Sequence, residues 1–294
     1  MSCQIPQRVA AIHDLSCFGR CALTVVIPTL SVMGYQVVPV PTALLSTHTG
    51  GFTDLHFRDM TEDMEKIASH FSSLGVTFSS IYTGFLGSVE QIETVTRFIE
   101  SFDHPDGEGK RPLIMVDPVM GDDGELYSTY TNELMQGMKR LAHHASVLTP
   151  NLTEACFLTD TPYFDSASLA PDEAKERANA LLDRLECFGA DRVVITGIFL
   201  SDGTLLNLGR DLDGRRFSVS RPVEAHAYPG TGDIFASVLL GALMQSGDFE
   251  AACREAADFI AVLIKDSATL PTPAREGVAL EAHLWRLCRP QGDL

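Results

Sequence analysis

Apolar runs along the chain alternate between two lengths, which predicts alternating strands and helices. RVAAI at 8–12 has the length of a buried strand, and 22–34 is a longer apolar run that ends in Gly34, a common helix stop. Further strands are predicted at 36–46, 78–87, 112–121, 145–151 and 191–197, and helices at 61–75, 88–102, 132–144, 152–160, 172–190, 232–246, 249–265 and 278–288. Segments 204–211 and 215–222 flank DLDG and predict a hairpin. This alternation predicts an α/β fold with a mostly parallel sheet covered on both faces.

The composition predicts a single domain over residues 1–294, because no low-complexity linker or break in composition divides the chain. The formal net charge of −17 excludes an electrostatic nucleic-acid binder, since no basic patch can dominate so acidic a surface. No run of about 18 apolar residues predicts a membrane span. The start MSCQIPQRVAAIHD lacks the pattern of a signal peptide. We therefore expect a cytoplasmic protein that binds neither nucleic acid nor membrane.

Seven scattered cysteines, an odd number, favour reduced thiols over a disulfide framework. They are Cys3, Cys17, Cys21, Cys156, Cys187, Cys253 and Cys288. Cys17 and Cys21 with His13 have the spacing that would put three metal ligands on one helix face. Small cysteines buried in helices are far commoner, so we favour packing for this trio.

Polar residues collect where the predicted strands end. They are His13, Asp14, 47–49, 83–85, Asp117, 149–151 and Thr196. The carboxyl ends of parallel strands meet at one edge of a sheet, and folds of this class bind ligands there. Six strands contribute, which predicts a ligand site at that edge.

The sequence GTGDIFA at 230–236 places two glycines, a threonine and an acid at the start of an apolar helix. Glycines let a phosphate approach the backbone N–H groups, and the helix dipole favours its charge. A simple capping acid is the plainer interpretation of Asp233, but two glycines around Thr231 are more than a cap requires. The dinucleotide fingerprint fails at Phe235, and no G-x-x-x-x-G-K-[ST] occurs. We therefore predict phosphate binding by amides beside a carboxylate.

Two further motifs place acids near predicted strand ends. VDPVMGDDGELY at 116–127 has Asp117 at a strand end, and TPNLTEA at 149–155 has Glu154 in the first turn of a helix. Alone, each has a plain structural role in a turn or a cap. Together they suit Mg²⁺, which takes one or two carboxylates with phosphate oxygens and waters.

Five motifs together resemble the vitamin B6 kinases of the ribokinase-like superfamily, the pyridoxal (pyridoxine, pyridoxamine) kinases. The motifs are GTGDIFA, DPVMGDDG, TPNLTEA, STHTG and YTGFLGS, and the resemblance spans about residues 9–268. GTGD indicates the superfamily, DPVMGD the branch shared with hydroxymethylpyrimidine kinases, and the last two motifs favour B6 kinases. The resemblance implies a three-layer α/β/α fold, a homodimer, and phosphorylation of a 5′-hydroxymethyl group by ATP with Mg²⁺ in pyridoxal 5′-phosphate salvage. It leaves a monovalent cation requirement open.

The resemblance also implies roles for single residues. Asp233 corresponds to the catalytic acid, and Gly230, Thr231 and Gly232 to the anion hole. The residues in contact with substrate would be Asp14, Thr49, Phe85 and Asp233. The residues in contact with ATP would be Asp117, Tyr127, Thr149, Asn151, Glu154, Thr196, Thr231 and Gly232. The metal ligands would be Asp117 and Glu154. Asp14 departs from the family, which commonly has serine there. A buried Asp14 needs a donor or cation opposite, either a protonated vitamer or Arg20.

Three other functions are weighed against this one. A hydroxymethylpyrimidine kinase of thiamine synthesis would share the acid and the anion hole. A non-catalytic nucleotide or vitamin sensor would not need Asp233, Asp117 and Glu154 together. A dehydrogenase is disfavoured by the failed glycine pattern. Outside the motifs, His48 could contact substrate or stabilise a strand end, and 50–60 could be a lid or a dimer contact.

Overall fold

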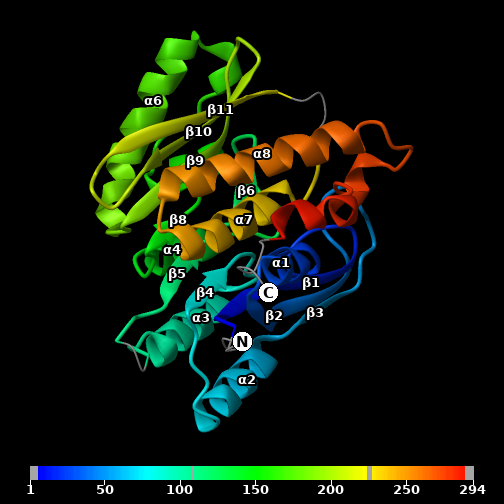
Figure 1. The fold of residues 1–294 in the computed structure, drawn as a ribbon, viewed down its shortest axis with the longest axis vertical. Coiled ribbons are helices and arrows are strands. Elements are labelled where there is room, and N and C mark those ends of the chain that lie inside the picture. The colour runs from blue at the N-terminus through cyan, green and yellow to red at the C-terminus, as the bar shows by residue number, and fades with distance from the viewer. Residues whose placement is uncertain (1–5, 107–108, 224–226, 289–294) are drawn as a thin grey trace, which may run out of the picture.

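Nine strands form one sheet through the middle of the molecule (Figure 1). The computed structural model describes residues 6–106, 109–223 and 227–288. The strands are β1 (Arg8–Phe18), β2 (Gln36–Thr47), β3 (Phe57–Asp59), β4 (Ser80–Thr83), β5 (Leu113–Val116), β8 (Val147–Leu148), β9 (Arg192–Phe199), β10 (Thr204–Arg210) and β11 (Arg216–Pro222). Their order is β11-β10-β9-β8-β5-β4-β1-β2-β3. The strands from β9 to β2 run parallel, and β3, β10 and β11 join antiparallel, so the predicted mostly parallel sheet is confirmed.

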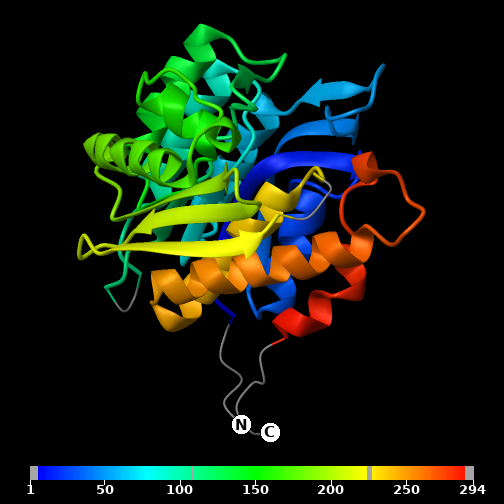
Figure 2. The same cartoon turned by 90° about the horizontal axis from the view of Figure 1, so that it is seen from above.

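Helices cover both faces of this sheet, which confirms the three-layer α/β/α fold (Figure 2). One face carries α1 (Leu23–Val32), α7 (Thr231–Ser246) and α8 (Phe249–Ser267), and the other α2 (Thr61–Ser73), α3 (Val89–Phe102), α4 (Asn132–Ala142), α5 (Leu152–Leu158) and α6 (Pro171–Arg184). Each face of the sheet has its own hydrophobic core. Along β1, Val9 and Ala11 lie in the core beneath α1, α7 and α8, whereas Ala10 and Ile12 lie in the core on the opposite face. Successive side chains of a strand point to opposite faces, so this central strand is apolar throughout.

The burial of α7 fixes the position of its first turn. All ten residues 234–243 are buried, which explains why the sequence is apolar on every side of this helix. Gly230 before the helix and Gly247 after it adopt left-handed backbone conformations, with φ of 79° and 71°. Glycine tolerates this region without steric cost, so these two residues end the helix sharply on both sides.

Several strands differ from their predicted ranges; β4, β5 and β8 are shorter than predicted, and two further differences lie near the strand ends. β1 continues from residue 12 to Phe18, through a bulge between His13 and Leu15, because β2 runs beside it over the whole length. The segment GDDGEL forms a separate hairpin of β6 (Gly121–Asp122) and β7 (Glu125–Leu126). Its turn residues Asp123 and Gly124 have φ of 50° and 81°, as a type I′ turn requires.

The predicted helix at 278–288 is wrong. The chain there forms two short 3₁₀ turns, Leu280–Ala282 and Leu284–Leu287. Contacts with the end of α8 replace the helical pattern: the Ala279 amide donates to the Ser267 hydroxyl at 2.9 Å, and His283 Nε2 lies 3.1 Å from Asp266 Oδ2. The helical spacing of the leucines predicted a helix. Contacts with α8 favour the two short turns instead, which is a tertiary effect that local propensity does not capture.

The order of the strands changes direction at β1. This strand pairs with β2 on one side and with β4 on the other, so connections leave it in opposite directions. Such a switch point is where α/β folds bind ligands, at the carboxyl ends of the strands. The ends of β1 and β4 are therefore the place to look for a site.

The described residues also bear on two composition-based expectations. Within them, no helix combines the length and apolar character that crossing a bilayer requires. Their six cysteines are all free thiols, and Cys3 lies outside the described residues.

Candidate active site

Neighbouring strand ends and the start of α7 bring polar side chains to one edge of the sheet. The set comprises His13 and Asp14 on β1, Thr83 on β4, Asp117 after β5, Thr149 after β8, and Asp233 in α7. The strands β1, β4, β5 and β8 are consecutive in the sheet, so their ends lie side by side. Asp233 Oδ1 lies 4.0 Å from His13 Nδ1, which places the start of α7 at the same edge.

The first turn of α7 presents backbone N–H groups that lack acceptors. In the described part of the chain, no hydrogen bond engages the amides of Thr231, Gly232 or Asp233, and Gly230 offers no capping side chain. A Cβ at Gly232 would meet no heavy atom within 4 Å, so space is open beside that amide. A Cβ at Gly230 would overlap the Arg20 carbonyl oxygen. Gly230 thus serves packing, whereas the open first turn suits an anion.

Asp233 projects from this turn with 18% of its side chain exposed. Its Oδ2 accepts a hydrogen bond from the Ala22 amide at 2.9 Å. Ala22 has φ 48° and ψ −135°, a region that costs a non-glycine residue about 1–3 kcal/mol, so the bond holds a strained loop against the acid. Burial and then the charge of Asp14 raise the pKa of Asp233 to about 7, against the Ala22 hydrogen bond. A carboxyl group that titrates near neutral pH suits a general base.

Asp14 is 7% exposed and lies in the bulge of β1. Its Oδ2 accepts a hydrogen bond from the Ser16 hydroxyl at 2.8 Å. Burial raises the pKa of Asp14, and the Ser16 hydrogen bond opposes that shift. Arg20 is not its partner, because Arg20 Nε lies 2.8 Å from Glu281 Oε1 in the C-terminal 3₁₀ turn. The suggested Asp14–Arg20 pair is therefore wrong.

Asp117 and Glu154 are buried carboxyl groups, and no basic side chain among the described residues pairs with either. Burial and then the Asp233 charge raise the pKa of Asp117 to about 8. Burial and then the Asp117 charge raise the pKa of Glu154 well above its ordinary value. Two buried acids that oppose each other's ionisation are suited to a divalent cation.

Glu154 also has a structural role at the start of α5. It forms a capping box with Asn151, in which the Asn151 amide donates to Glu154 Oε2 and the Glu154 amide donates to Asn151 Oδ1, both at 2.8 Å. The Met120 amide donates to Oε1 at 3.1 Å. Each carboxylate oxygen retains acceptor capacity. No group of three or more His, Cys, Asp or Glu within the described ranges could hold a metal, so a cation here would need phosphate oxygens as well.

Four of the predicted nucleotide residues lie after β7, after β8 and within β9. Asn151 forms an isolated parallel bridge with Thr196, which joins the start of α5 to β9. Thr149 is buried after β8, and Tyr127 is 40% exposed after β7. Burial and then the Glu154 charge raise the pKa of Tyr127. Their contacts with a nucleotide stay predictions.

Two predicted substrate residues lie on separate segments. Thr49 is exposed in the loop after β2, and a Cβ on its neighbour Gly50 would lie 3.9 Å from Pro229, which directly precedes Gly230. Phe85 is half-buried after β4, with its ring centroid 6.5 Å from that of Tyr130. Thr49 therefore belongs to a loop that reaches the start of α7, whereas Phe85 lies on the opposite side of the switch point.

His48 has a structural role, one of the two that the sequence left open. Its Nδ1 accepts a hydrogen bond from the Gly50 amide at 3.1 Å. The proton is therefore on Nε2, which donates to the Arg275 carbonyl at 2.7 Å. Both ring nitrogens are engaged with backbone, so the ring ties the loop after β2 to the segment before the C-terminal turns. Within 50–60, 57–59 forms the edge strand β3.

The metal trio considered from the sequence lacks its structural basis. His13 and Cys17 lie on the strand β1, and Cys21 lies in the loop after it, so the three do not share a helix face. Cys17 is exposed and Cys21 is buried. Strand pairing with β2 and β4 overrides the helical spacing here.

Several buried side chains at this edge keep polar atoms without partners. Among the described residues they include His13 Nδ1 and Nε2, Thr83 Oγ1 and Tyr130 Oη. Buried polar groups are normally hydrogen-bonded, so a concentration of unpaired ones points to a ligand. Sequence reasoning noted His13 at a strand end and weighed it only as a ligand in the disfavoured metal trio with Cys17 and Cys21. The sequence contained a signal for its burial, because His13 shares the strand face of Val9 and Ala11, which both lie in the core.

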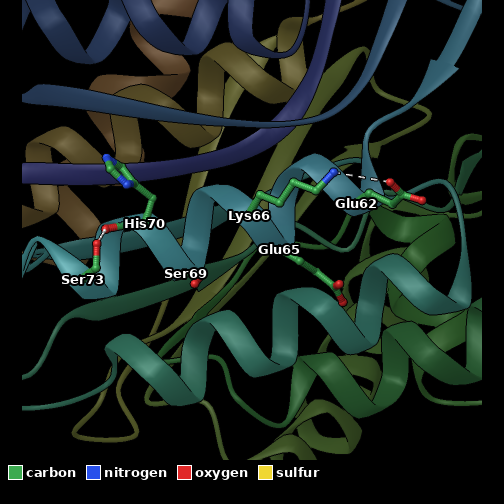
Figure 3. A pocket seen from close by; sticks show the side chains of 6 residues that line it. All are labelled: Glu62, Glu65, Lys66, Ser69, His70 and Ser73. Carbon is green, nitrogen blue, oxygen red and sulfur yellow. Dashed lines mark hydrogen bonds and ion pairs between the residues drawn. The ribbon is translucent and has the colours of Figure 1, made fainter.

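A hollow of about 650 Å³ lies elsewhere, on the outer face of α2 (Figure 3). The side chains that line it are Glu62, Glu65, Lys66, Ser69, His70 and Ser73. Figure 3 shows them spread along one helix, with Lys66 bonded to Glu62. None belongs to the strand-end set.

Comparisons with known proteins agree with this architecture. The phosphomethylpyrimidine kinase family model matches residues 10–275. A Bacteroides thetaiotaomicron protein assigned as a phosphomethylpyrimidine kinase is 40% identical with a TM-score of 0.88, covering 100% of this chain and 98% of that one. Its second crystal form, with pyridoxal, has a TM-score of 0.87 at 40% identity and 98% coverage of both chains.

Two kinases named for B6 vitamers are also similar. Pyridoxal kinase from Leishmania donovani, solved with ADP and pyridoxine, is 25% identical with a TM-score of 0.81, covering 97% of this chain and 96% of that one. The pyridoxine/pyridoxal/pyridoxamine kinase of Bordetella avium is 26% identical over 94% of this chain and 93% of its own. The chain therefore belongs to the phosphomethylpyrimidine kinase family, within the ribokinase-like kinases.

Proposed function

We propose that this chain uses ATP to phosphorylate the 5′-hydroxymethyl group of a B6 vitamer: pyridoxal, pyridoxine or pyridoxamine. One observation carries the proposal: a single helix turn offers amides at 231–233 that have no acceptor among the described residues, together with a carboxyl group, Asp233, whose pKa is raised to about 7. An anion site and a base are thus in adjacent positions. A similar protein solved with pyridoxal and a similar kinase solved with ADP and pyridoxine support both substrates.

In this reaction Asp233 accepts the proton of the attacking alcohol as the alcohol oxygen bonds to the γ-phosphorus. The N–H groups of Thr231 and Gly232 stabilise negative charge on the transferred phosphoryl group. The bond to the bridging oxygen breaks, and ADP leaves with its electron pair. Phosphoryl transfer requires positioning and charge neutralisation more than covalent assistance, which suits a rigidly held helix start.

Mg²⁺, when bound, neutralises phosphate charge in reactions of this kind. Asp117 and Glu154 would hold it here. The fit rests on their raised pKa values and on the lack of a basic partner among the described residues. Asp117 follows β5 and Glu154 begins α5, so the two acids are fixed by separate rigid elements.

We also propose a cytoplasmic homodimer. The dimer rests on the resemblance to B6 kinases, and the compartment on the free thiols of the six described cysteines. Light scattering at micromolar concentration is expected to give twice the mass of one chain. A monomer mass at every concentration would reject the dimer.

Hydroxymethylpyrimidine kinase activity is the second candidate, because the matching family model carries the related phosphomethylpyrimidine name. A substrate panel separates the two. The purified protein is incubated with ATP, MgCl₂ and pyridoxal, pyridoxine, pyridoxamine or hydroxymethylpyrimidine, and ADP and the phosphorylated product are quantified. We expect higher kcat/KM for at least one vitamer than for hydroxymethylpyrimidine. The reverse order would assign the chain to the second candidate, and no turnover with any of the four would favour a sensor.

A further inference from the structure

His13 is a fully buried histidine with no hydrogen-bond partner on either ring nitrogen among the described residues. Its ring packs edge-on against Tyr82 of β4, with centroids 4.3 Å apart and planes at 76°. A Cβ at Gly84 would overlap the imidazole, so the glycine that follows β4 makes room for this ring. Packing alone does not explain a histidine here, because an apolar side chain would fill the space without burying unpaired nitrogens.

The carboxylate of Asp233 lies beside this ring. His13 Nδ1 is 4.0 Å from Oδ1 of Asp233. The other Asp233 oxygen, Oδ2, is already held by the Ala22 amide. Oδ1 is therefore the oxygen that is available for a substrate proton, and His13 is the side chain beside it. A shift of about 1 Å would bring Nδ1 within ordinary hydrogen-bond distance.

The surroundings keep the imidazole neutral. Burial lowers the pKa of His13 to about 3, so the ring carries one proton at neutral pH. The titratable groups around His13 and Asp233 are the acids Asp14 and Asp117, the Tyr82 hydroxyl and the Cys21 thiol. An ionised carboxylate only accepts hydrogen bonds, so facing Asp233 favours the tautomer with the proton on Nδ1.

We propose that His13 is a positioning residue for the base. Its Nδ1–H donates to Oδ1 of the ionised Asp233, which orients that oxygen's remaining lone pair toward the substrate alcohol and stabilises the carboxylate. This inference rests on the proposed kinase function, in which Asp233 removes the proton. His13 itself does not touch the substrate.

Two substitutions form a matched pair. His13→Asn keeps an N–H donor on the atom that corresponds to Nδ1, and His13→Leu keeps the volume but removes the donor. We expect His13→Leu to lower kcat on the order of 10- to 100-fold, the range for losing a hydrogen bond to a charged group, with KM for ATP unchanged. His13→Asn should retain kcat within about 5-fold of wild type, since it keeps that bond.

Two further readouts distinguish positioning from a structural role. The acidic limb of the kcat profile should move to higher pH in His13→Leu, because the ionised Asp233 loses a stabilising donor. The melting temperature of His13→Leu should stay close to that of wild type, because the variant loses the bond to Asp233 but also removes the unpaired, buried Nε2. Unchanged kcat and pH limb in His13→Leu, or equal losses in both variants, would overturn the proposal.

A readout without turnover separates this inference from the proposed function. In ¹⁵N-histidine-labelled protein, His13 should show the shifts of a neutral ring protonated on Nδ1, and these should change in Asp233→Asn. The Nε2-protonated tautomer would reject the positioning role, even if the wild-type enzyme phosphorylates B6 vitamers or if His13→Leu does not fold. No turnover of any substrate by wild type, with the Nδ1 tautomer present, would reject the kinase function alone.

Discussion

Asp14 gives the candidate substrate site a negative charge where the resemblance leads one to expect a neutral serine hydroxyl. The carboxyl group is buried, one oxygen accepts from Ser16, and Arg20 is engaged by Glu281. A buried carboxylate without a cation is costly, and its raised pKa expresses that cost. A substrate that brings a protonated nitrogen would offset it. Asp14 is therefore the residue at which selection among vitamers is expected.

The first prediction replaces this charge with the family's hydroxyl. Asp14→Ser should lower kcat/KM for pyridoxamine or pyridoxine more than for pyridoxal, by on the order of 10-fold, because a charge-assisted hydrogen bond is lost. Steady-state kinetics with the three vitamers measure this. Ser16→Ala is the control, since it removes the neighbour's hydroxyl and keeps the carboxylate. An equal change for all three vitamers would rule out selection by Asp14.

At the level of elements, the two glycines at the start of α7 are required for different reasons. Gly230 is required by backbone geometry, with φ 79° and the Arg20 carbonyl oxygen where a Cβ would stand. Gly232 has no such constraint, since a Cβ there would be in open space. Alanine is the better helix former there, so the missing side chain fits the proposed approach of a phosphate to these amides.

The second prediction compares alanine at the two positions. Gly232→Ala should keep or raise stability, by up to about 1 kcal/mol, while a methyl group beside the amides lowers kcat by on the order of 10-fold or more. Gly230→Ala should lower stability by at least about 1–2 kcal/mol, through its left-handed backbone and the overlap with Arg20. Thermal unfolding and kcat are measured on both. Full activity in Gly232→Ala would contradict phosphate binding at this turn.

Elements with strong local signals are predictable from the sequence, and those set by distant partners are not. The alternation of runs predicts the central strands and α7, and GTGD predicts where an anion would bind. The extension of β1 depends on pairing with β2, and the C-terminal turns depend on hydrogen bonds to α8. The strained Ala22 and its bond to Asp233 join residues 211 positions apart, so no local pattern shows them. Phe235 stands where the dinucleotide fingerprint has a glycine, and this local signal correctly disfavours a dehydrogenase.

At the scale of the whole molecule, buried acids make stability depend on pH in an unusual direction. Burial raises the pKa of Asp14, Asp117, Glu154 and Asp233, with values of about 8 for Asp117 and about 7 for Asp233. The folded state thus holds protons that the unfolded state releases near pH 4. Folding stability therefore falls as pH rises from about 4 toward 8, and the net charge of −17 adds repulsion in the same direction.

The single-domain organisation over 1–294 stays a prediction.

The third prediction follows from this linkage. Without ligands, the melting temperature should be higher at pH 6 than at pH 8, and MgCl₂ with ATP should raise it more at pH 8, where the acids are ionised. Sodium chloride at the same ionic strength is the control for screening. Asp117→Asn should weaken both the pH dependence and the effect of Mg²⁺. A melting temperature that rises steadily from pH 6 to pH 8 in the ligand-free protein would contradict the raised pKa values.

The central claim, that Asp233 removes the proton from a vitamer alcohol at the start of α7, is tested most directly by the turnover of Asp233→Asn. With ATP, MgCl₂ and the best vitamer from the panel, kcat should fall on the order of 100-fold or more, because the variant keeps the shape but loses the base. ATP binding, followed by calorimetry, should persist because the amides remain. Turnover near the wild-type rate, with the fold intact, would contradict the role of Asp233 as the base.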